Sequence, residues 1–321
     1  MEYLTLAHSD LKVSRLCMGG CPLGEYGWGA VDHNALVRTV EAAVDNGITM
    51  FDTADIYGLG SSEEILGQVL GEKRKQVVIA TKFGVRIENG KTYYDNSKGW
   101  IRKAVEGSLK RLNTDYIDLY QIHYRDGKTP MADIVESLQE LRKEGKIRYF
   151  GLSNITVDDI VELIPYKEQF VSFQDEYSLA TRKNEMIIQG VQENLELTPM
   201  SWGSLGQGIL TGKYSKDSFF GEDDRRSRDI YTNFHGEKLL HNLAIVDELK
   251  RISQLNCHSV PSIAIRFILD YIKNSIVLVG IKNERQLAAN LEAMEYNLSN
   301  EYINFLLRIS EWIKEKNRLD Y

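Results

Sequence analysis

The stretch FDTADIYG, residues 51–58, places an acid and a phenol directly after a short apolar run. The residues before it are typical of a buried strand, and such strands normally exclude charged side chains. Asp52 and Tyr57 therefore lie where a strand ends. They belong either to a plain polar turn or to a site at the end of that strand, and the rest of the chain separates these interpretations.

Short apolar runs and helical patterns alternate along the chain. The runs predicted to form buried strands are residues 16–20, 48–54, 77–82, 116–123, 147–154, 171–177, 197–205 and 275–281. Patterns with apolar spacing near 3.6, such as residues 33–47 and 131–146, lie between them. This alternation predicts a parallel sheet, and eight such units predict a closed (β/α)8 (TIM) barrel. An open doubly wound sheet is the alternative, but no G-x-G-x-x-G follows the first strand.

Further elements are expected at the two ends of the barrel sequence. The segments EYLTL and LKVSRL predict an N-terminal β-hairpin, and residues 302–321 predict an extra C-terminal helix. Since no linker interrupts the chain, we expect one domain over residues 1–321. Residues 87–96 and 214–236 look irregular, and long irregular loops in compact domains are often lids or binding loops.

The composition limits the kinds of partner. The 321 residues carry a net charge of -7 with a pI near 5.5, so we expect no binding to nucleic acid or to a membrane surface. No apolar stretch approaches the roughly 18 residues of a membrane span, and we expect no signal peptide. Cys17, Cys21 and Cys257 lack the spacing of a zinc site. We therefore expect a cytoplasmic protein with reduced thiols and no metal.

Polar side chains recur where the predicted strands end. They are Asp52, Lys82, His123, Ser153 with Asn154, and Gln174, and they are followed by Trp202 before the turn GSLGQG. Active sites of TIM barrels lie at the carboxyl ends of the strands. Several such residues at equivalent ends favour a functional site over isolated structural charges.

An ordered set of motifs now points to a family. FDTADIYG, ATKFG, the His of DLYQIH, GLSN, the Gln of SFQDEY, GSLGQGILTGKY and GIKNERQLAAN follow one another along the chain. In this order they resemble the aldo-keto reductase family, from the hairpin to Asn290. The longer loops and the stretch GQGILTGKY are most similar to the bacterial and potassium-channel-β-like branch.

The resemblance implies four catalytic residues: Asp52, Tyr57, Lys82 and His123. They fit an NADPH-dependent reduction of an aldehyde, ketone or sugar carbonyl, in which Tyr57 is the general acid. A free Tyr has a pKa of about 10, and we expect the Lys82 ammonium to lower it. Asp52 would hold Lys82 in place, and His123 would orient the substrate oxygen.

The resemblance also implies a cofactor site. Its expected residues are Gly20, Ser153, Asn154, Gln174, Trp202, Gly203, Ser204, Leu205, Gly206, Lys213, Gly280, Lys282, Gln286 and Asn290. Trp202 would stack on the nicotinamide, and Lys282 falls where relatives contact the 2′-phosphate, which favours NADPH over NADH. Gly203 and Ser204 depart from the family pattern. Arg225 or Arg226 would fold over the cofactor or remain solvated.

The substrate itself is not identified by the sequence. Trp28, Tyr94 and Tyr124 are expected to bind it, together with Tyr26 and Tyr93 in an aromatic wall, unless these rings are plain surface residues. Two alternatives use the same cofactor site. One is a sugar or polyol dehydrogenase that works with NAD(P)+, and the other is a redox-sensing regulatory subunit with slow turnover.

Overall fold

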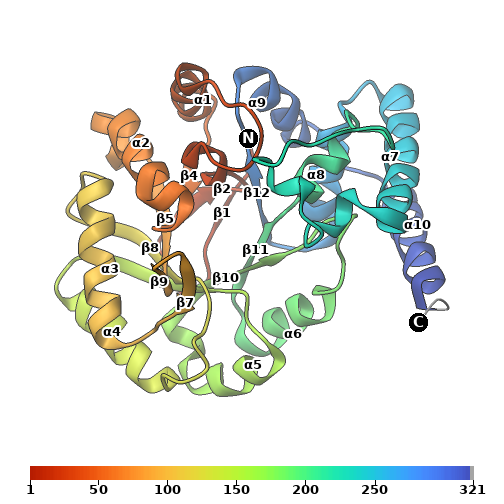
Figure 1. Cartoon of the computed structure of the whole chain (residues 1–321). Coiled ribbons are helices and arrows are strands. Elements are labelled where there is room, and N and C mark those ends of the chain that lie inside the picture. Colours follow the sequence, from red (N-terminus) through yellow and green to blue (C-terminus); the bar gives the residue numbers. More distant parts are fainter. Residues whose placement is uncertain (319–321) are drawn as a thin grey trace.

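A closed barrel of parallel strands forms the centre of the molecule (Figure 1). This computed structural model describes residues 1–318, with side chains for residues 1–311. The barrel strands are β3 (Leu16–Gly19), β4 (Met50–Asp52), β5 (Val78–Phe83), β8 (Ile117–Ile122), β9 (Ile147–Ser153), β10 (Phe170–Glu176), β11 (Thr198–Trp202) and β12 (Ile276–Gly280). Each lies at a predicted run, and β12 pairs with β3 to close the ring. The predicted TIM barrel is confirmed.

Helices surround the barrel (Figure 1). They are α1 (His33–Asp45), α2 (Ser61–Leu70), α3 (Lys98–Arg111), α4 (Met131–Lys143), α5 (Val157–Leu163), α6 (Glu185–Leu195), α7 (Gly236–Asn256), α8 (Val260–Tyr271), α9 (Glu284–Leu291) and α10 (Asn300–Arg318). The sequence pattern did not identify α2, α5 or α8. All residues of α8 from Ser262 to Leu269 are buried, and its polar residues Ser262, Arg266 and Asp270 make contacts within the protein, so no solvent-exposed face marks this helix.

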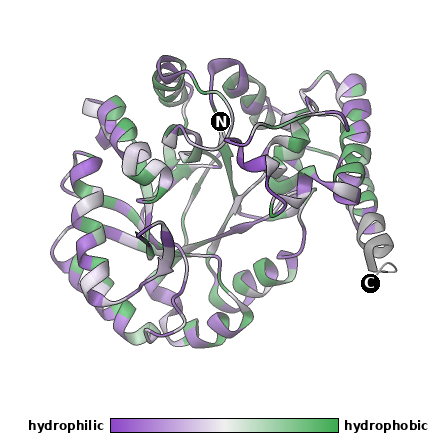
Figure 2. Cartoon of the chain, viewed as in Figure 1, coloured by the Kyte–Doolittle hydropathy of each residue, from purple (hydrophilic) through white to green (hydrophobic). Residues whose placement is uncertain are grey.

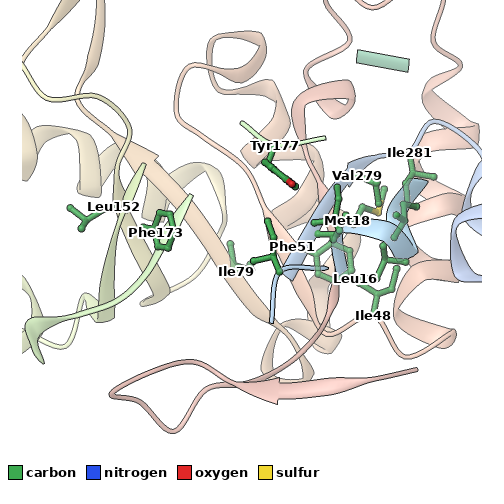
Figure 3. Close-up of a cluster of buried hydrophobic side chains, with 14 of the residues drawn as sticks. Leu16, Met18, Ile48, Phe51, Ile79, Leu152, Phe173, Tyr177, Val279 and Ile281 are labelled. Carbon is green, nitrogen blue, oxygen red and sulfur yellow. The ribbon is translucent and has the colours of Figure 1, made fainter. Parts of the chain in front are cut away.

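The apolar core lies between the strands and the helices. Leu16 and Met18 on β3 meet Phe51 on β4 and Val279 on β12, as the register of these strands requires and as Figure 3 shows. Figure 2 shows that many helices carry both hydrophobic and hydrophilic residues, as expected for helices packed on a barrel.

A second apolar cluster closes one end of the barrel. The predicted hairpin is present as β1 (Tyr3–Thr5) and β2 (Lys12–Ser14). Leu6, Leu11 and Val13 from it pack with side chains inside the barrel, including Met50 and Leu119. The hairpin therefore covers the amino ends of the barrel strands and leaves the carboxyl ends open.

Residues 87–96 and 214–236 were both predicted to be irregular, and the structure agrees for only one of them. The prediction is wrong for much of residues 87–96, because β6 (Val85–Glu88) and β7 (Lys91–Tyr94) form an antiparallel hairpin there. Residues 214–236 contain only short 3-10 turns, such as Arg225–Ser227. We call residues 214–236 the strap. In Figure 1 it is the blue-green segment before α7, which runs toward the N-terminal part of the chain.

Candidate active site

The alternation of side chains along the strands directs the predicted polar residues into the barrel. On β5, Val78 and Ala80 belong to the cluster inside the barrel, so Lys82 points inward as well. On β4 the same period places Asp52 on the inside, two residues after Met50. Both polar residues come at the carboxyl ends of their strands, away from the hairpin.

A shift in the register of strand β10 turns its polar residue Gln174 toward the inside of the barrel. Its register with β9 shifts between Phe170 and Phe173, which both pack outside the barrel. Val171 packs inside, and Gln174 follows on the inside three residues later. A regular strand would place residues three apart on opposite faces, so the shift brings Gln174 to the site. Its Nε2 donates to Asp52 Oδ2 over 2.8 Å.

A buried ion pair lies at the centre of the site. Lys82 Nζ is 2.5 Å from Asp52 Oδ1, and the two side chains are 1% and 3% exposed. The ammonium also donates to the carbonyl of Thr53 over 2.9 Å. Asp52 Oδ2 accepts hydrogen bonds from Gln121 over 3.0 Å and from Gln174. Because buried charges are costly unless they are paired and hydrogen-bonded, these contacts stabilise both charged forms.

Tyr57 lies in the turn after β4, beside this pair. Its hydroxyl is 3.4 Å from Lys82 Nζ, and its ring meets the His123 ring edge-on, with centroids 5.9 Å apart. The turn packs closely on the neighbouring loop, since a Cβ on Gly24 would lie 2.7 Å from the nitrogen of Gly58. Backbone packing therefore fixes the position of the phenol.

The electrostatics of the site set two protonation states. Burial raises the pKa of Tyr57 well above its ordinary value, and the Asp52 charge adds to this effect. Burial, followed by the Lys82 charge, lowers the pKa of His123 well below its ordinary value. At neutral pH the phenol is therefore protonated and the imidazole is neutral. The net shift of the Tyr57 pKa is upward, opposite to the lowering expected from Lys82, because desolvation is the largest effect and the Asp52 charge acts in the same direction.

A cavity of about 1700 Å³ opens at the carboxyl ends of the strands. The predicted site residues that line it are Gly20, Trp28, Asp52, Tyr57, Tyr94, His123, Tyr124, Ser153, Asn154, Gln174, Trp202, Gly203, Ser204, Leu205, Lys213, Gly280, Lys282, Gln286 and Asn290. Lys82 is fully buried and contacts the cavity residues Asp52 and Tyr57. Gly206 does not line the cavity, because its N–H donates to the Gly203 carbonyl over 2.7 Å and closes the turn.

Three side chains of the cavity wall, those of Ser153, Asn154 and Trp202, suit a flat amide-bearing ring. Asn154 has a φ of +53° and donates from Nδ2 to the His123 carbonyl and to Ser153 Oγ, each over 3.0 Å. This arrangement holds the amide against the end of β9. Trp202, at the end of β11, has a buried Nε1 that lacks a hydrogen-bond partner among the described residues.

Cations gather at another part of the cavity wall. Burial and the charges of Arg226 and Lys213 lower the pKa of Lys282 to about 8. Lys282 Nζ and Arg226 Nη2 both donate to the carbonyl of Trp28. Asp224 pairs with Arg226 at 2.5 Å and balances only part of this charge. Three neighbouring cations on one wall suit an anion such as a phosphate group.

Comparison with known proteins decides the family. The model of the Aldo/keto reductase family matches residues 15–311, nearly the whole chain. The chain belongs to the aldo-keto reductase family. The match confirms the resemblance that the sequence motifs indicated. The relatives described next include a channel-β-like protein, as the motifs also indicated.

Relatives of this aldo-keto reductase cover almost its full length. It is 35% identical to the aldo-keto reductase YhdN of Bacillus subtilis, over 94% of this chain and 91% of that one. It is 30% identical to a probable voltage-gated potassium channel subunit beta of Oryza sativa, over 92% of each chain. Among solved structures, the glycerol dehydrogenase of Gluconobacter oxydans superposes with a TM-score of 0.85 at 33% identity, over 96% of this chain and 94% of that one.

Membership of this family makes the protein an oxidoreductase that acts on carbonyl compounds with NAD(P). The residues present fit a dinucleotide. The cavity exceeds the roughly 300–1,000 Å³ of ordinary ligand pockets, and its wall carries both an aromatic ring and a cationic cluster. Among residues 1–318, no helix is long and apolar enough to cross a membrane.

Part of the cavity wall of this aldo-keto reductase is aromatic. Tyr94 stacks on Tyr124 with centroids 5.0 Å apart, and Trp28 donates from Nε1 to Cys21 Sγ over 3.1 Å. Tyr26 also lines the cavity. Tyr93 does not line the cavity. Neighbouring side chains of a strand point to opposite faces, so Tyr93 and Tyr94 lie on opposite faces of the β6–β7 hairpin.

Sequence reasoning missed two residues of the site. Gln121 lies on β8, two positions before His123, and it donates to Asp52. Because side chains two apart on a strand share a face, the sequence could have predicted that Gln121 faces inward with His123. Gln207 donates to Glu176 over 3.0 Å and accepts from Asn233 of the strap over 2.6 Å. No sequence pattern marks this link, because it depends on where the strap crosses the barrel.

Proposed function

We propose that the protein reduces the carbonyl group of an aldehyde, ketone or sugar with NADPH, with Tyr57 as the general acid. The supporting observation is the buried chain of contacts from Asp52 through Lys82 to the Tyr57 hydroxyl at the cavity wall. A protonated phenol beside an ammonium is suited to give a proton to an oxygen that gains negative charge.

The cofactor, when bound, supplies the hydride for this reaction. Ser153, Asn154 and Trp202 would hold and orient its nicotinamide against the catalytic residues. The neutral His123 would donate a hydrogen bond to the substrate oxygen and position it near Tyr57. As Tyr57 loses its proton, the Lys82 ammonium would stabilise the phenolate that forms. The same residues would serve alcohol oxidation in the reverse direction.

The cationic wall supports NADPH over NADH. The cofactors differ by a 2′-phosphate, and Lys213, Arg226 and Lys282 form a group of positive charges that such a phosphate would neutralise. Relief of the repulsion between these cations would add to the affinity for the phosphorylated cofactor.

The experiment that tests this function is a titration of the purified protein with NADPH and NADH, followed by intrinsic tryptophan fluorescence. We expect quenching by both, with tighter binding of NADPH, and then NADPH oxidation in a panel of aldehydes, ketones and sugars. Binding of NADPH without turnover of any carbonyl would contradict the proposed activity. Absence of quenching by either cofactor would contradict the cofactor site as well.

A further inference from the structure

The strap places one side chain at the substrate end of the cavity. The backbone N–H of Arg225 donates to the carbonyl of Gly27 over 2.9 Å, which docks the strap on the loop after β3. The side chain then runs along this glycine, because a Cβ on Gly27 would lie 2.6 Å from both Cγ and Nε of Arg225. Arg225 is half-buried and lines the cavity together with Tyr57.

The guanidinium of Arg225 has aromatic neighbours but no anionic partner. Its central carbon is 5.1 Å from the ring centroid of Tyr26 and 5.8 Å from that of Trp28. Within the described residues it makes no ion pair, and its Nε is buried without a hydrogen-bond partner. A buried donor without a partner is costly, so this arrangement favours a bound acceptor.

Two nearby carboxylates are already engaged elsewhere. Asp224, the preceding residue, pairs with Arg226 at 2.5 Å. Glu25, on the loop that Arg225 contacts, pairs with His33 at 2.6 Å. The protein therefore leaves the Arg225 charge available toward the cavity.

Arg225 and the cationic wall lie on different sides of Trp28. Arg226 and Lys282 donate to the carbonyl of Trp28, whereas the guanidinium of Arg225 lies over the rings of Trp28 and Tyr26. The charge of Arg225 also acts on the Tyr57 phenol and on the Cys21 thiol and lowers the pKa of each, against the larger effect of burial. Of the two adjacent arginines of the strap, Arg225 is thus the one whose charge acts on Tyr57.

The surroundings of Arg225 define the group it suits. Aromatic and aliphatic residues form a large part of the cavity wall, namely Tyr26, Trp28, Ile56, Val85, Tyr94 and Tyr124. A planar guanidinium binds a planar carboxylate through two parallel hydrogen bonds. One unpaired cation also matches the single charge of a carboxylate better than the double charge of a phosphate.

We propose that Arg225 binds a carboxylate of the substrate, so that the preferred substrates are carbonyl acids with a flat apolar frame. This proposal rests on the carbonyl reductase function proposed above. It makes Arg225 a specificity residue, which selects the substrate and leaves the proton transfer to Tyr57.

The test compares an acid with its neutral ester. Wild-type protein, Arg225→Met and the control Arg228→Met are assayed with NADPH on 3- and 4-carboxybenzaldehyde and on their methyl esters. Arg228 is an exposed strap residue outside the cavity, so its replacement removes the same charge from the same segment. We expect wild type and Arg228→Met to prefer at least one acid. In Arg225→Met the acid-to-ester ratio of kcat/KM should fall roughly 10- to 100-fold, the usual worth of a hydrogen-bonded charge.

Two results would overturn the proposal. One is a wild-type protein that reduces acids no faster than esters. The other is an Arg225→Met variant that loses activity equally on both or binds NADPH more weakly, which would assign Arg225 to the fold or to the cofactor. Thermal melting of each variant checks that the fold is intact.

A binding measurement separates this proposal from the proposed function. Calorimetry with benzoate and with neutral benzamide requires no turnover. If no carbonyl is reduced, but wild type binds benzoate and Arg225→Met does not, the carboxylate site stands and the reductase function fails. If wild type binds neither compound, or if both proteins bind benzoate equally, the carboxylate site is refuted.

Discussion

Asp52 shows how much of the site depends on one carboxylate. It accepts hydrogen bonds from Lys82, Gln121 and Gln174, which come from three different strands. The three donors fix both of its oxygens, so the ammonium of Lys82 has one stable position. The distance from that ammonium to the Tyr57 hydroxyl is therefore set by the barrel and not by a flexible side chain.

Replacement of Tyr57 tests its role as the proton donor. We expect Tyr57→Phe to lower kcat for carbonyl reduction by roughly 100- to 10,000-fold, the usual contribution of general acid catalysis, because the ring remains and only the hydroxyl group that donates the proton is lost. The dissociation constant for NADPH should change little. The matched control is Tyr93→Phe, which alters an exposed phenol outside the cavity. Wild-type turnover by Tyr57→Phe would refute the mechanism.

The pH dependence should follow the two shifted groups. Since the pKa of Tyr57 is raised, the phenol keeps its proton, and reduction should stay constant from neutral to mildly alkaline pH. Oxidation of an alcohol needs the phenolate, so its rate should rise with pH across the alkaline range. The pKa of His123 is lowered, so no inflection from it should fall near its ordinary value of about 6.5.

Profiles of kcat/KM against pH in both directions provide the measurement. An inflection near pH 6.5 that is absent in His123→Asn would show that the imidazole titrates there and would contradict its neutral assignment. A reduction rate that falls steadily from neutral pH upward would contradict the raised pKa of Tyr57.

The sequence predicted positions better than protonation states. The position of Asp52 and Lys82 at the ends of two predicted strands was enough to predict that they share the barrel mouth. The direction of the Tyr57 pKa shift was missed, because it depends on how completely the phenol is desolvated. That quantity arises from the packing of the loop around Gly24 and Gly58, which are distant in sequence.

At the scale of elements, one arginine makes several polar contacts with α10. Arg182 Nη1, in the connection between β10 and α6, donates to the Leu307 carbonyl over 3.1 Å and to Ser310 Oγ over 2.9 Å. The guanidinium also pairs with Glu185 at 2.6 Å. A single side chain thus joins two elements that are far apart in the sequence.

Arg182→Met should loosen this helix. The expected result is faster amide hydrogen exchange and faster proteolysis around residues 300–311, because the Leu307 carbonyl loses a partner and Glu185 loses its ion pair. Lys183→Met is the control, since Lys183 is exposed and its nearest carboxylate oxygen, on Glu176, is 3.5 Å away. Equal exchange in the two variants would show that α10 is held by its apolar contacts alone.

Element prediction succeeded for the apolar strands of the barrel and for most of the helices, and it failed for α2, α5, α8 and the β6–β7 hairpin. The eight barrel strands are short apolar runs between helical patterns, so their order followed from the sequence. Helix α8 was missed because it is buried on most sides. The β6–β7 hairpin was missed because all residues of β7 are exposed, so no apolar alternation marks it.

At the scale of the whole molecule, cofactor binding should raise thermal stability. A ligand at 100 times its dissociation constant adds about 2.7 kcal/mol to the free energy of unfolding. We expect a larger rise in Tm with NADPH than with equimolar NADH, because only NADPH carries the phosphate for the cationic wall. Lys282→Met should reduce this difference, whereas Lys273→Met, an exposed control, should not. Equal shifts for both cofactors in wild type would refute the phosphate site.

The position of the N-terminal hairpin at the base of the barrel also indicates where the protein can be labelled or immobilised. Tyr3 donates from its hydroxyl to the carbonyl of Gly47, in the connection that leads from α1 into the amino end of β4. The first residues are therefore anchored on the side away from the mouth of the barrel, where the cavity opens. An affinity tag, a fluorophore or a solid support joined at Met1 should leave that mouth facing the solution, so the immobilised protein should admit cofactor and substrate as readily as the free one.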